Sequence, residues 1–183
     1  NKFNGLVIEV LTTTNCEEVE LYRNGKLMGR ERTADYTNNT IVWNIPYTPG
    51  KLEAKGFNKG KEVAYWKIET AGKLATLKLK ADRQTIKADG QDLSHIDLTL
   101  IDDKGVKVQT DNRMITVKVS GEGRLVALDS GDLRLNKFYT NQIKSYFGHA
   151  LLTVQSTRKP GVIHAEIQVE RIDKPFEVVI RTR

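Results

Sequence analysis

The sequence predicts an all-β protein built from two tandem immunoglobulin-like β-sandwich domains. Short runs in which apolar and polar residues alternate recur along all 183 residues, and turn residues such as glycine, asparagine and proline separate them. None of these runs keeps the spacing of an amphipathic helix. Short strands at regular intervals with polar turns are typical of sandwiches, and two modules of roughly 70 to 110 residues fit the length.

The first module is expected to cover residues 1–72 and to begin with a strand at residues 5–11. Residues 19–22 then lead into Asn24-Gly25, a dipeptide that strongly favours a two-residue β-hairpin. Three later runs predict further strands, at residues 41–47, 52–57 and 63–68.

The second module is expected to cover residues 73–183, because residues 70–73 interrupt the alternation and a new run starts after them. Residues 131–142 fit neither a strand nor a long helix, so we interpret them as an extended loop that packs on its module or contacts a neighbour. The remaining runs predict strands at residues 74–79, 96–101, 115–119, 151–155, 162–169 and 176–180.

The composition argues against several functional classes. Lysine and arginine give a net charge of +6, but they are scattered and mixed with acidic residues, so no nucleic-acid partner is expected. No apolar run approaches the roughly 20 residues that cross a bilayer, so no membrane insertion is expected. Cys16 is the single cysteine, which excludes an internal disulfide and a cysteine-built zinc site. The sequence starts at Asn1 without a leader, as a mature product or a piece of a longer chain would.

No metal, cofactor or catalytic residue is expected. Residues 89–92 and 102–105 resemble calcium loops only in part, because neither has the alternating oxygen ligands and the closing glutamate, and we interpret both as turns. The acidic pair Glu17-Glu18 is also interpreted as a turn. The three histidines have no spacing that would pre-arrange metal ligands; they are His95, His149 and His164.

Three aromatic residues of the first module are candidates for carbohydrate contact, because aromatic rings stack on the apolar faces of sugars. They are Trp43, Tyr65 and Trp66. Trp43 lies between Val42 and Ile45 in a predicted strand, which favours a place in the core over a sugar platform. Tyr65 and Trp66 are adjacent, so a regular strand sends them to opposite faces, and one is expected to be buried and the other exposed.

Four aromatic residues of the second module lie within ten residues of each other: Phe138, Tyr139, Tyr146 and Phe147. They could cap the core of the module or dock onto a neighbouring domain. We therefore name them as candidates for interdomain contact.

Several phrases of the chain resemble bacterial β-galactosidases of glycoside hydrolase family 2. In the first module these are VELYRNGK at 19–26, WNIPYTPGKLEA at 43–54 and TAG at 70–72, which look like a module that follows the catalytic barrel. In the second module LKL at 77–79 and ADGQDLS at 88–94 resemble the immunoglobulin-like module that ends many of those enzymes. The segment DSGD at 129–132 departs from that pattern, because it lacks the asparagine of the family's Asn-Gly-Asp turn.

The resemblance implies a non-catalytic C-terminal region of a β-galactosidase-like glycosidase that supports the domain arrangement and access to the active site. Its expected partners are the catalytic barrel and sandwich domains of the same parent chain, in the periplasm or at the surface of a bacterium. The family's catalytic carboxylates lie on a (β/α)₈ barrel, which takes roughly 250 residues. No catalytic residue is therefore expected in this chain.

Two other functions fit the residues. A carbohydrate-binding module that targets an enzyme to polymeric glycan would expose a row of aromatic side chains. A bacterial surface adhesin is also built from tandem immunoglobulin-like modules, although adhesin repeats resemble each other and these two modules share no visible period.

Overall fold

The computed structural model describes residues 4–134 and 140–183. The chain divides into two compact units, Asn1–Thr70 and Ala71–Arg183. Within the described residues the regular structure is β-strand apart from two single-turn 3₁₀ helices, η1 (Thr33–Asp35) and η2 (Thr37–Asn39). No helix in the part of the chain that the structure describes has the length and hydropathy that a membrane span requires.

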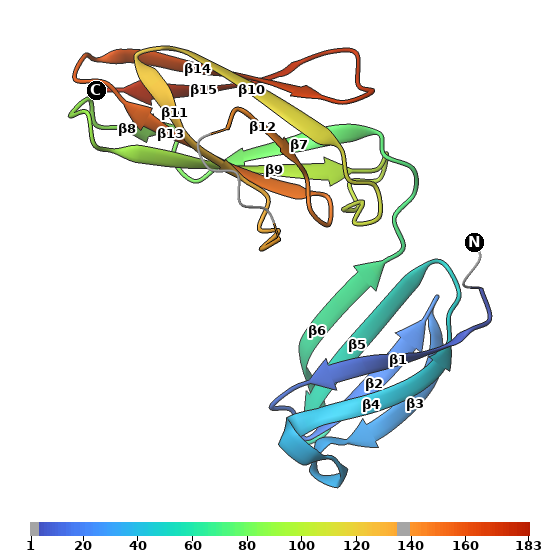
Figure 1. The fold of residues 1–183 in the computed structure, drawn as a ribbon. Coiled ribbons are helices and arrows are strands. Elements are labelled where there is room, and N and C mark those ends of the chain that lie inside the picture. Colours follow the sequence, from blue (N-terminus) through green and yellow to red (C-terminus); the bar gives the residue numbers. More distant parts are fainter. Residues whose placement is uncertain (1–3, 135–139) are drawn as a thin grey trace. The chain divides into compact units, whose positions relative to one another are not determined.

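The first unit packs a two-stranded sheet against a four-stranded sheet (Figure 1). Strands β1 and β4 pair antiparallel, and the larger sheet has the order β3-β2-β5-β6. The core between the sheets consists of Val19, Leu21, Ile41, Trp43 and Ile45. The strands are β1 (Val7–Thr13), β2 (Glu18–Arg23), β3 (Lys26–Arg32), β4 (Thr40–Pro46), β5 (Lys51–Asn58) and β6 (Lys61–Glu69).

The second unit is a sandwich of a five-stranded sheet, β12-β10-β14-β15-β8, and a four-stranded sheet, β11-β13-β9-β7 (Figure 1). Strands β15 and β8 pair in parallel, so β15, the last strand in chain order, lies inside the sheet between β14 and β8. The strands are β7 (Thr76–Ala81), β8 (Thr85–Ile86), β9 (Leu93–Ile101), β10 (Met114–Gly121), β11 (Gly123–Asp129), β12 (Gln142–Lys144), β13 (His149–Ser156), β14 (Gly161–Val169) and β15 (Phe176–Thr182).

Strict alternation builds the core of the second unit. On β9, Ile96, Leu98 and Leu100 are fully buried while the residues between them face outward. On β14, Ile163 and Ile167 are equally buried. Because side chains in a strand point to alternate faces, each strand contributes one apolar face to a single core.

The prediction of an all-β fold with immunoglobulin-like sandwiches is confirmed, and the expected strands are present. The hairpin predicted at Asn24-Gly25 joins β2 to β3; both residues have positive φ, 50° and 80°, as a type I′ turn requires. Strands β8, β11 and β12 were not expected from the sequence, and β3 was expected only as the second strand of this hairpin, without bounds. Gly72, expected in the first module, lies in the second unit, where its backbone N–H donates to Oδ2 of Asp102 at 2.7 Å.

Strand β6 lies at one edge of the larger sheet of the first unit and pairs with β5 alone. All nine of its residues are exposed. The smaller sheet has only two strands, and the core residues that it covers lie on β2, not on β6. The unit therefore leaves both faces of β6 and its outer backbone edge open.

Candidate functional site

Trp43 belongs to the core and offers no sugar platform. Its side chain is 6% exposed, and its indole Nε1 donates a hydrogen bond to Oγ1 of Thr12 at 3.0 Å. The ring packs against the backbone of Gly29, where an added Cβ would lie 3.1 Å from Cζ3 of the indole. With its ring enclosed and its donor satisfied, Trp43 cannot stack on a sugar, and this candidate carbohydrate contact is wrong.

Tyr65 and Trp66 are both exposed, 46% and 74%, so the expectation that one of them is buried is wrong. They do point to opposite faces of β6, since Tyr65 lies opposite Lys55 and Trp66 opposite Ala54 in the pairing with β5. The smaller sheet does not reach over β6, and this is why neither ring is covered. Two of the three candidate carbohydrate contacts are thus accessible, but they do not form one platform.

The outer face of the larger sheet carries further rings that the sequence analysis did not name. Tyr22 and Phe57 lie on the same face as Tyr65. The ammonium of Lys55 stands over the ring of Tyr22 at 5.5 Å, and the guanidinium of Arg30 over the ring of Phe57 at 5.1 Å. One face of each of these two half-buried rings is therefore covered by a cation, and Tyr65, at 46% exposed, is the most exposed of the three.

Tyr65 is fixed by its neighbours. Its hydroxyl donates to Oε1 of Glu53 at 2.6 Å, and Lys51 forms an ion pair with the same carboxylate at 2.8 Å. The Lys51 ammonium, followed by the Tyr65 hydroxyl, lowers the pKa of Glu53. The surface therefore presents the phenol ring of Tyr65 in a fixed position beside two charged groups. Such a surface can bind a polar ligand that needs a single stacking contact.

Two of the four candidate interdomain residues can be placed. Tyr146 and Phe147 form a turn with ring centroids 4.4 Å apart, and Tyr146 and His149 exchange backbone hydrogen bonds of 3.0 Å. Phe147 at the tip is 53% exposed and has a φ of 46°, while Gly148 follows with 67°. A bulky residue in the left-handed region is uncommon, so the turn holds this ring outward at a conformational cost. Phe138 and Tyr139 lie outside the described residues.

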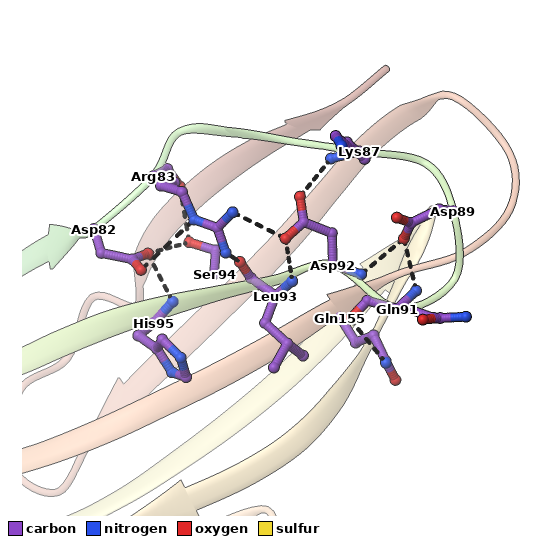
Figure 2. A network of polar contacts seen from close by, with 10 residues as sticks. All are labelled: Asp82, Arg83, Lys87, Asp89, Gln91, Asp92, Leu93, Ser94, His95 and Gln155. Atoms are coloured by element: carbon purple, nitrogen blue, oxygen red, sulfur yellow. Dashed lines mark hydrogen bonds and ion pairs between the residues drawn. The ribbon is translucent and has the colours of Figure 1, made fainter.

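The aspartates of the segment between β7 and β9 hold its turns together (Figure 2). The guanidinium of Arg83 lies between Asp82 and Asp92, at 2.9 Å from the latter's Oδ1. Oδ2 of Asp92 accepts the backbone N–H of Lys87 at 2.8 Å, and Oδ1 of Asp89 accepts two backbone N–H groups of the turn that follows it. These hydrogen bonds lower the pKa of Asp89 and Asp92. The segment 89–92 is a hydrogen-bonded turn, as expected.

Asp102 attaches the start of the second unit to its body. The residue is 2% exposed, and its carboxylate accepts backbone N–H groups from Gly72 at 2.7 Å, Lys104 at 2.9 Å and Val106 at 2.8 Å. The bond from Gly72, followed by the bonds from its own turn, lowers the pKa of Asp102. A single carboxylate thus closes the turn 102–105 and fixes a segment 30 residues away.

We expect Asp102→Asn to lower the melting temperature of the second unit at pH 7 by about 5 °C, because an amide offers one acceptor oxygen where the carboxylate offers two. The pKa of Asp102 is lower in the folded protein than in the unfolded chain. The charged carboxylate therefore stabilises the fold fully at a pH above the unfolded pKa, and this stabilisation is lost as the pH falls through the folded pKa. Thermal unfolding followed by circular dichroism between pH 7 and pH 2 should show the difference from wild type shrinking in acid. The neighbouring, exposed Asp103→Asn is the control; an equal loss in that variant would contradict the role of Asp102.

A surface crevice of about 620 Å³ lies in the second unit where Gly72–Ala75 run beside the end of β14. Three cationic and three acidic side chains line it: Lys73, Arg113, Arg171, Asp111, Glu170 and Asp173. Arg113 is paired with Asp111 at 2.7 Å. None of the described residues that line the crevice is aromatic, so these residues offer no stacking surface for a sugar.

The titratable groups do not gather into a reactive centre within residues 4–134 and 140–183. No group of three or more histidine, cysteine, aspartate or glutamate side chains is placed to hold a metal ion there. Cys16 is buried under Gly56, where an added Cβ would lie 2.5 Å from its Sγ. Two of the histidines form surface pairs, His149 with Asp97 at 3.3 Å and His164 with Glu177 at 2.6 Å.

Comparison with known proteins matches the second unit to a described domain family. Residues 77–175, more than half of the chain, match the family described as glycoside hydrolase family 2 C-terminal domain 5. The chain belongs to glycoside hydrolase family 2. Residues 5–64 match a family described as a domain of unknown function, DUF4982.

Relatives of this family 2 chain are much longer than the chain itself. It is 33% identical over 147 residues to a β-galactosidase of Bacteroides ovatus; the alignment covers 80% of this chain and 17% of the relative. It is 27% identical over 194 residues to a β-galactosidase of Thermoanaerobacter pseudethanolicus, and that alignment covers 96% of this chain and 24% of the relative. A crystal structure of a family 2 member from Bacteroides cellulosilyticus is similar with a TM-score of 0.94 and 34% identity, over 99% of this chain and 23% of that one. The family 2 chain therefore spans about a quarter or less of these proteins, as a C-terminal region.

Proposed function

We propose that this chain is the non-catalytic C-terminal region of a bacterial β-galactosidase-like enzyme, in which it supports the domain arrangement and shapes access to the active site. The observation that carries the proposal is the similarity over 99% of the chain to a family 2 member of which it covers 23%. The remaining length of such a protein has room for the catalytic barrel, which this all-β region does not contain.

The state of the carboxylates supports a non-catalytic role. A glycosidase needs one carboxylic acid whose pKa is raised so that it can donate a proton to the leaving group. Among the described residues, every carboxylate with a shifted pKa is shifted downward; these are Glu53, Asp82, Asp89, Asp92, Asp102 and Asp132. Their oxygens are held by hydrogen bonds or ion pairs within the two units, which suits turn and sheet stabilisation.

The partners in this proposal are the catalytic barrel and sandwich domains of the same parent chain, in the periplasm or at the cell surface of a bacterium. The exposed Phe147 and Trp66 supply apolar contact points on the second and the first unit, respectively. Aromatic side chains are suited to docking because they have only two rotatable bonds, so little side-chain entropy is lost when they are covered.

The test uses the 183-residue chain and a full-length family 2 enzyme that contains it, both assayed with a chromogenic β-galactoside. The isolated chain is expected to show no turnover. Deletion of the region from the full-length enzyme is expected to lower both its melting temperature and its kcat/KM. Turnover that copurifies with the isolated chain would overturn the non-catalytic assignment, and a deletion without effect would overturn the supporting role.

Carbohydrate binding is a second candidate, favoured by the exposure of Tyr65 and Trp66. Titration calorimetry of the chain against galactosides and against plant and host glycans tests it. Saturable binding that Trp66→Ala or Tyr65→Ala abolishes would establish a targeting role. No heat with any glycan would leave the supporting role alone.

A further inference from the structure

Two dipeptides of the first unit have the sequence Asn-Gly: Asn4-Gly5 and Asn24-Gly25. Because glycine has no Cβ, its backbone nitrogen can reach the side chain of the asparagine before it. The nitrogen forms a bond to Cγ of the asparagine, its proton leaves with the side-chain amide as ammonia, and water then opens the resulting cyclic imide. The product is aspartate or, when the ring opens at the main-chain carbonyl, isoaspartate. Water is the only reagent that this reaction needs.

The folded first unit holds the side chain of Asn24 at both ends of its amide. Oδ1 accepts the backbone N–H of Lys51 at 2.7 Å, and Nδ2 donates to the backbone C=O of Pro49 at 3.2 Å. The backbone N–H of Asn24 also donates to the C=O of Lys51 at 2.8 Å. These three hydrogen bonds, which we call the Asn24 clasp, join the hairpin of β2 and β3 to the turn between β4 and β5.

Gly50 packs directly against the Asn24 clasp. An added Cβ at this residue would lie 2.0 Å from Oδ1 and 2.7 Å from Cγ of Asn24, and its φ of 132° favours glycine. Thr70 fixes Gly50 in place, because its Oγ1 accepts the N–H of Gly50 at 3.1 Å and its own N–H donates to the C=O of Gly50 at 2.8 Å. The asparagine side chain therefore lies between a fixed backbone and its two hydrogen-bond partners.

This arrangement opposes closure of the imide ring. The side chain and backbone of Asn24 must rotate to bring Cγ onto the nitrogen of Gly25, and that rotation breaks the bonds to Pro49 and Lys51. The hairpin also holds Asn24 and Gly25 in a type I′ turn, with φ of 50° and 80°. Both residues are exposed to solvent, so the clasp and the turn protect Asn24, and burial does not.

We propose that Asn24-Gly25 is a site of spontaneous deamidation that the fold of the first unit protects and that reacts when this unit unfolds. The products do not fit the clasp. An aspartate at this position has no N–H for the C=O of Pro49 and places a charged oxygen beside it. An isoaspartate adds a methylene to the main chain inside a two-residue turn, which disturbs the pairing of β2 with β3. Chains that remain unfolded therefore lose the ability to refold the first unit.

Peptide mapping by mass spectrometry tests the proposal on the whole 183-residue chain, incubated at mildly alkaline pH with and without guanidinium chloride. In denaturant, Asn24 should convert at a rate similar to that of Asn4, because both precede glycine in an unfolded chain. Without denaturant, Asn24 should convert at least about tenfold more slowly than in denaturant. Equal rates at Asn24 in the two conditions would overturn the proposal. Conversion of Asn4 but not of Asn24 in denaturant would overturn it as well.

The dependence of the rate on denaturant concentration provides a second test. Both tryptophans of the chain, Trp43 and Trp66, lie in the first unit, so their fluorescence reports the unfolding of this unit. The rate of conversion at Asn24 should rise in proportion to the unfolded fraction of the first unit. A rate that stays constant through the unfolding transition would contradict protection by the fold.

Gly50→Ala displaces the side chain of Asn24, since its Cβ would occupy the place of Oδ1. Without denaturant, conversion at Asn24 is expected to accelerate about tenfold, because the bonds of the clasp are lost. Gly60→Ala is the matched control: Gly60 also has a positive φ, 75°, but no atom of the described residues lies within 4 Å of an added Cβ. The two variants are compared at the same unfolded fraction, which guanidinium chloride adjusts. Equal rates at that fraction would overturn the role of the clasp.

Discussion

Trp43→Ala is expected to lower the free energy of unfolding of the first unit by about 3 to 5 kcal/mol, the usual cost of removing a large buried ring. Trp43 is one of the five residues that form the hydrophobic core cluster of this small unit, and its Nε1 donates a hydrogen bond to Oγ1 of Thr12. A domain of this size has only about 5 to 15 kcal/mol of stability, so the variant should lose much of it. Urea unfolding followed by circular dichroism gives the value.

Trp66→Ala is the matched control, because it removes the same side chain from an exposed position of the same unit. Its effect should stay within about 0.5 kcal/mol. A large loss in Trp66→Ala would contradict the exposure of this ring. A small loss in Trp43→Ala would contradict the assignment of Trp43 to the core.

Gly148→Ala is expected to destabilise the second unit by about 3 kcal/mol or more. The residue has a φ of 67°, which costs any residue with a Cβ, and an added Cβ would lie 2.1 Å from the carbonyl oxygen of Val108. The neighbouring backbone cannot easily move, since the C=O of Gly148 accepts the N–H of Leu100 at 2.9 Å and its N–H donates to Asn112 at 3.1 Å. Denaturant unfolding of the second unit measures the loss.

Gly131→Ala separates the two causes of that loss. Gly131 has a similar φ of 75°, but no atom of the described residues lies within 4 Å of an added Cβ. Only the conformational cost of about 1 to 2 kcal/mol should remain. Equal losses in the two variants would show that the backbone at Gly148 relaxes away from Val108.

Period-two alternation was enough to predict the strands that line a core. Strands β4, β9 and β14 alternate between buried residues, most of them apolar, and more exposed ones along nearly their whole length. The hairpin at Asn24-Gly25 was predicted, but the bounds of its second strand, β3, were not, because Lys26–Arg32 is mostly charged and contains Gly29, whose missing side chain makes room for the ring of Trp43. That requirement comes from a strand far away in the sequence and is invisible in a local pattern.

The candidate site was harder to predict for a related reason. Adjacent aromatic residues in a strand must point to opposite faces, and this was correct for Tyr65 and Trp66. Whether either face is covered depends on how many strands the opposing sheet has, and the first unit supplies only two. The turn at Asp102 was expected, but its bond to Gly72 links residues 30 positions apart and could be found only in three dimensions.

The position of β15 in its sheet determines when the second unit can complete its fold during synthesis. The ribosome makes Phe176–Thr182 after every other strand of the second unit, yet the strand belongs between β14 and β8 and contributes the buried Ile180. Strand β8, made about ninety residues earlier, has no partner in the sheet until then. The first unit can close while translation continues, whereas the second must wait with one flank of its core uncovered until its final strand leaves the ribosome.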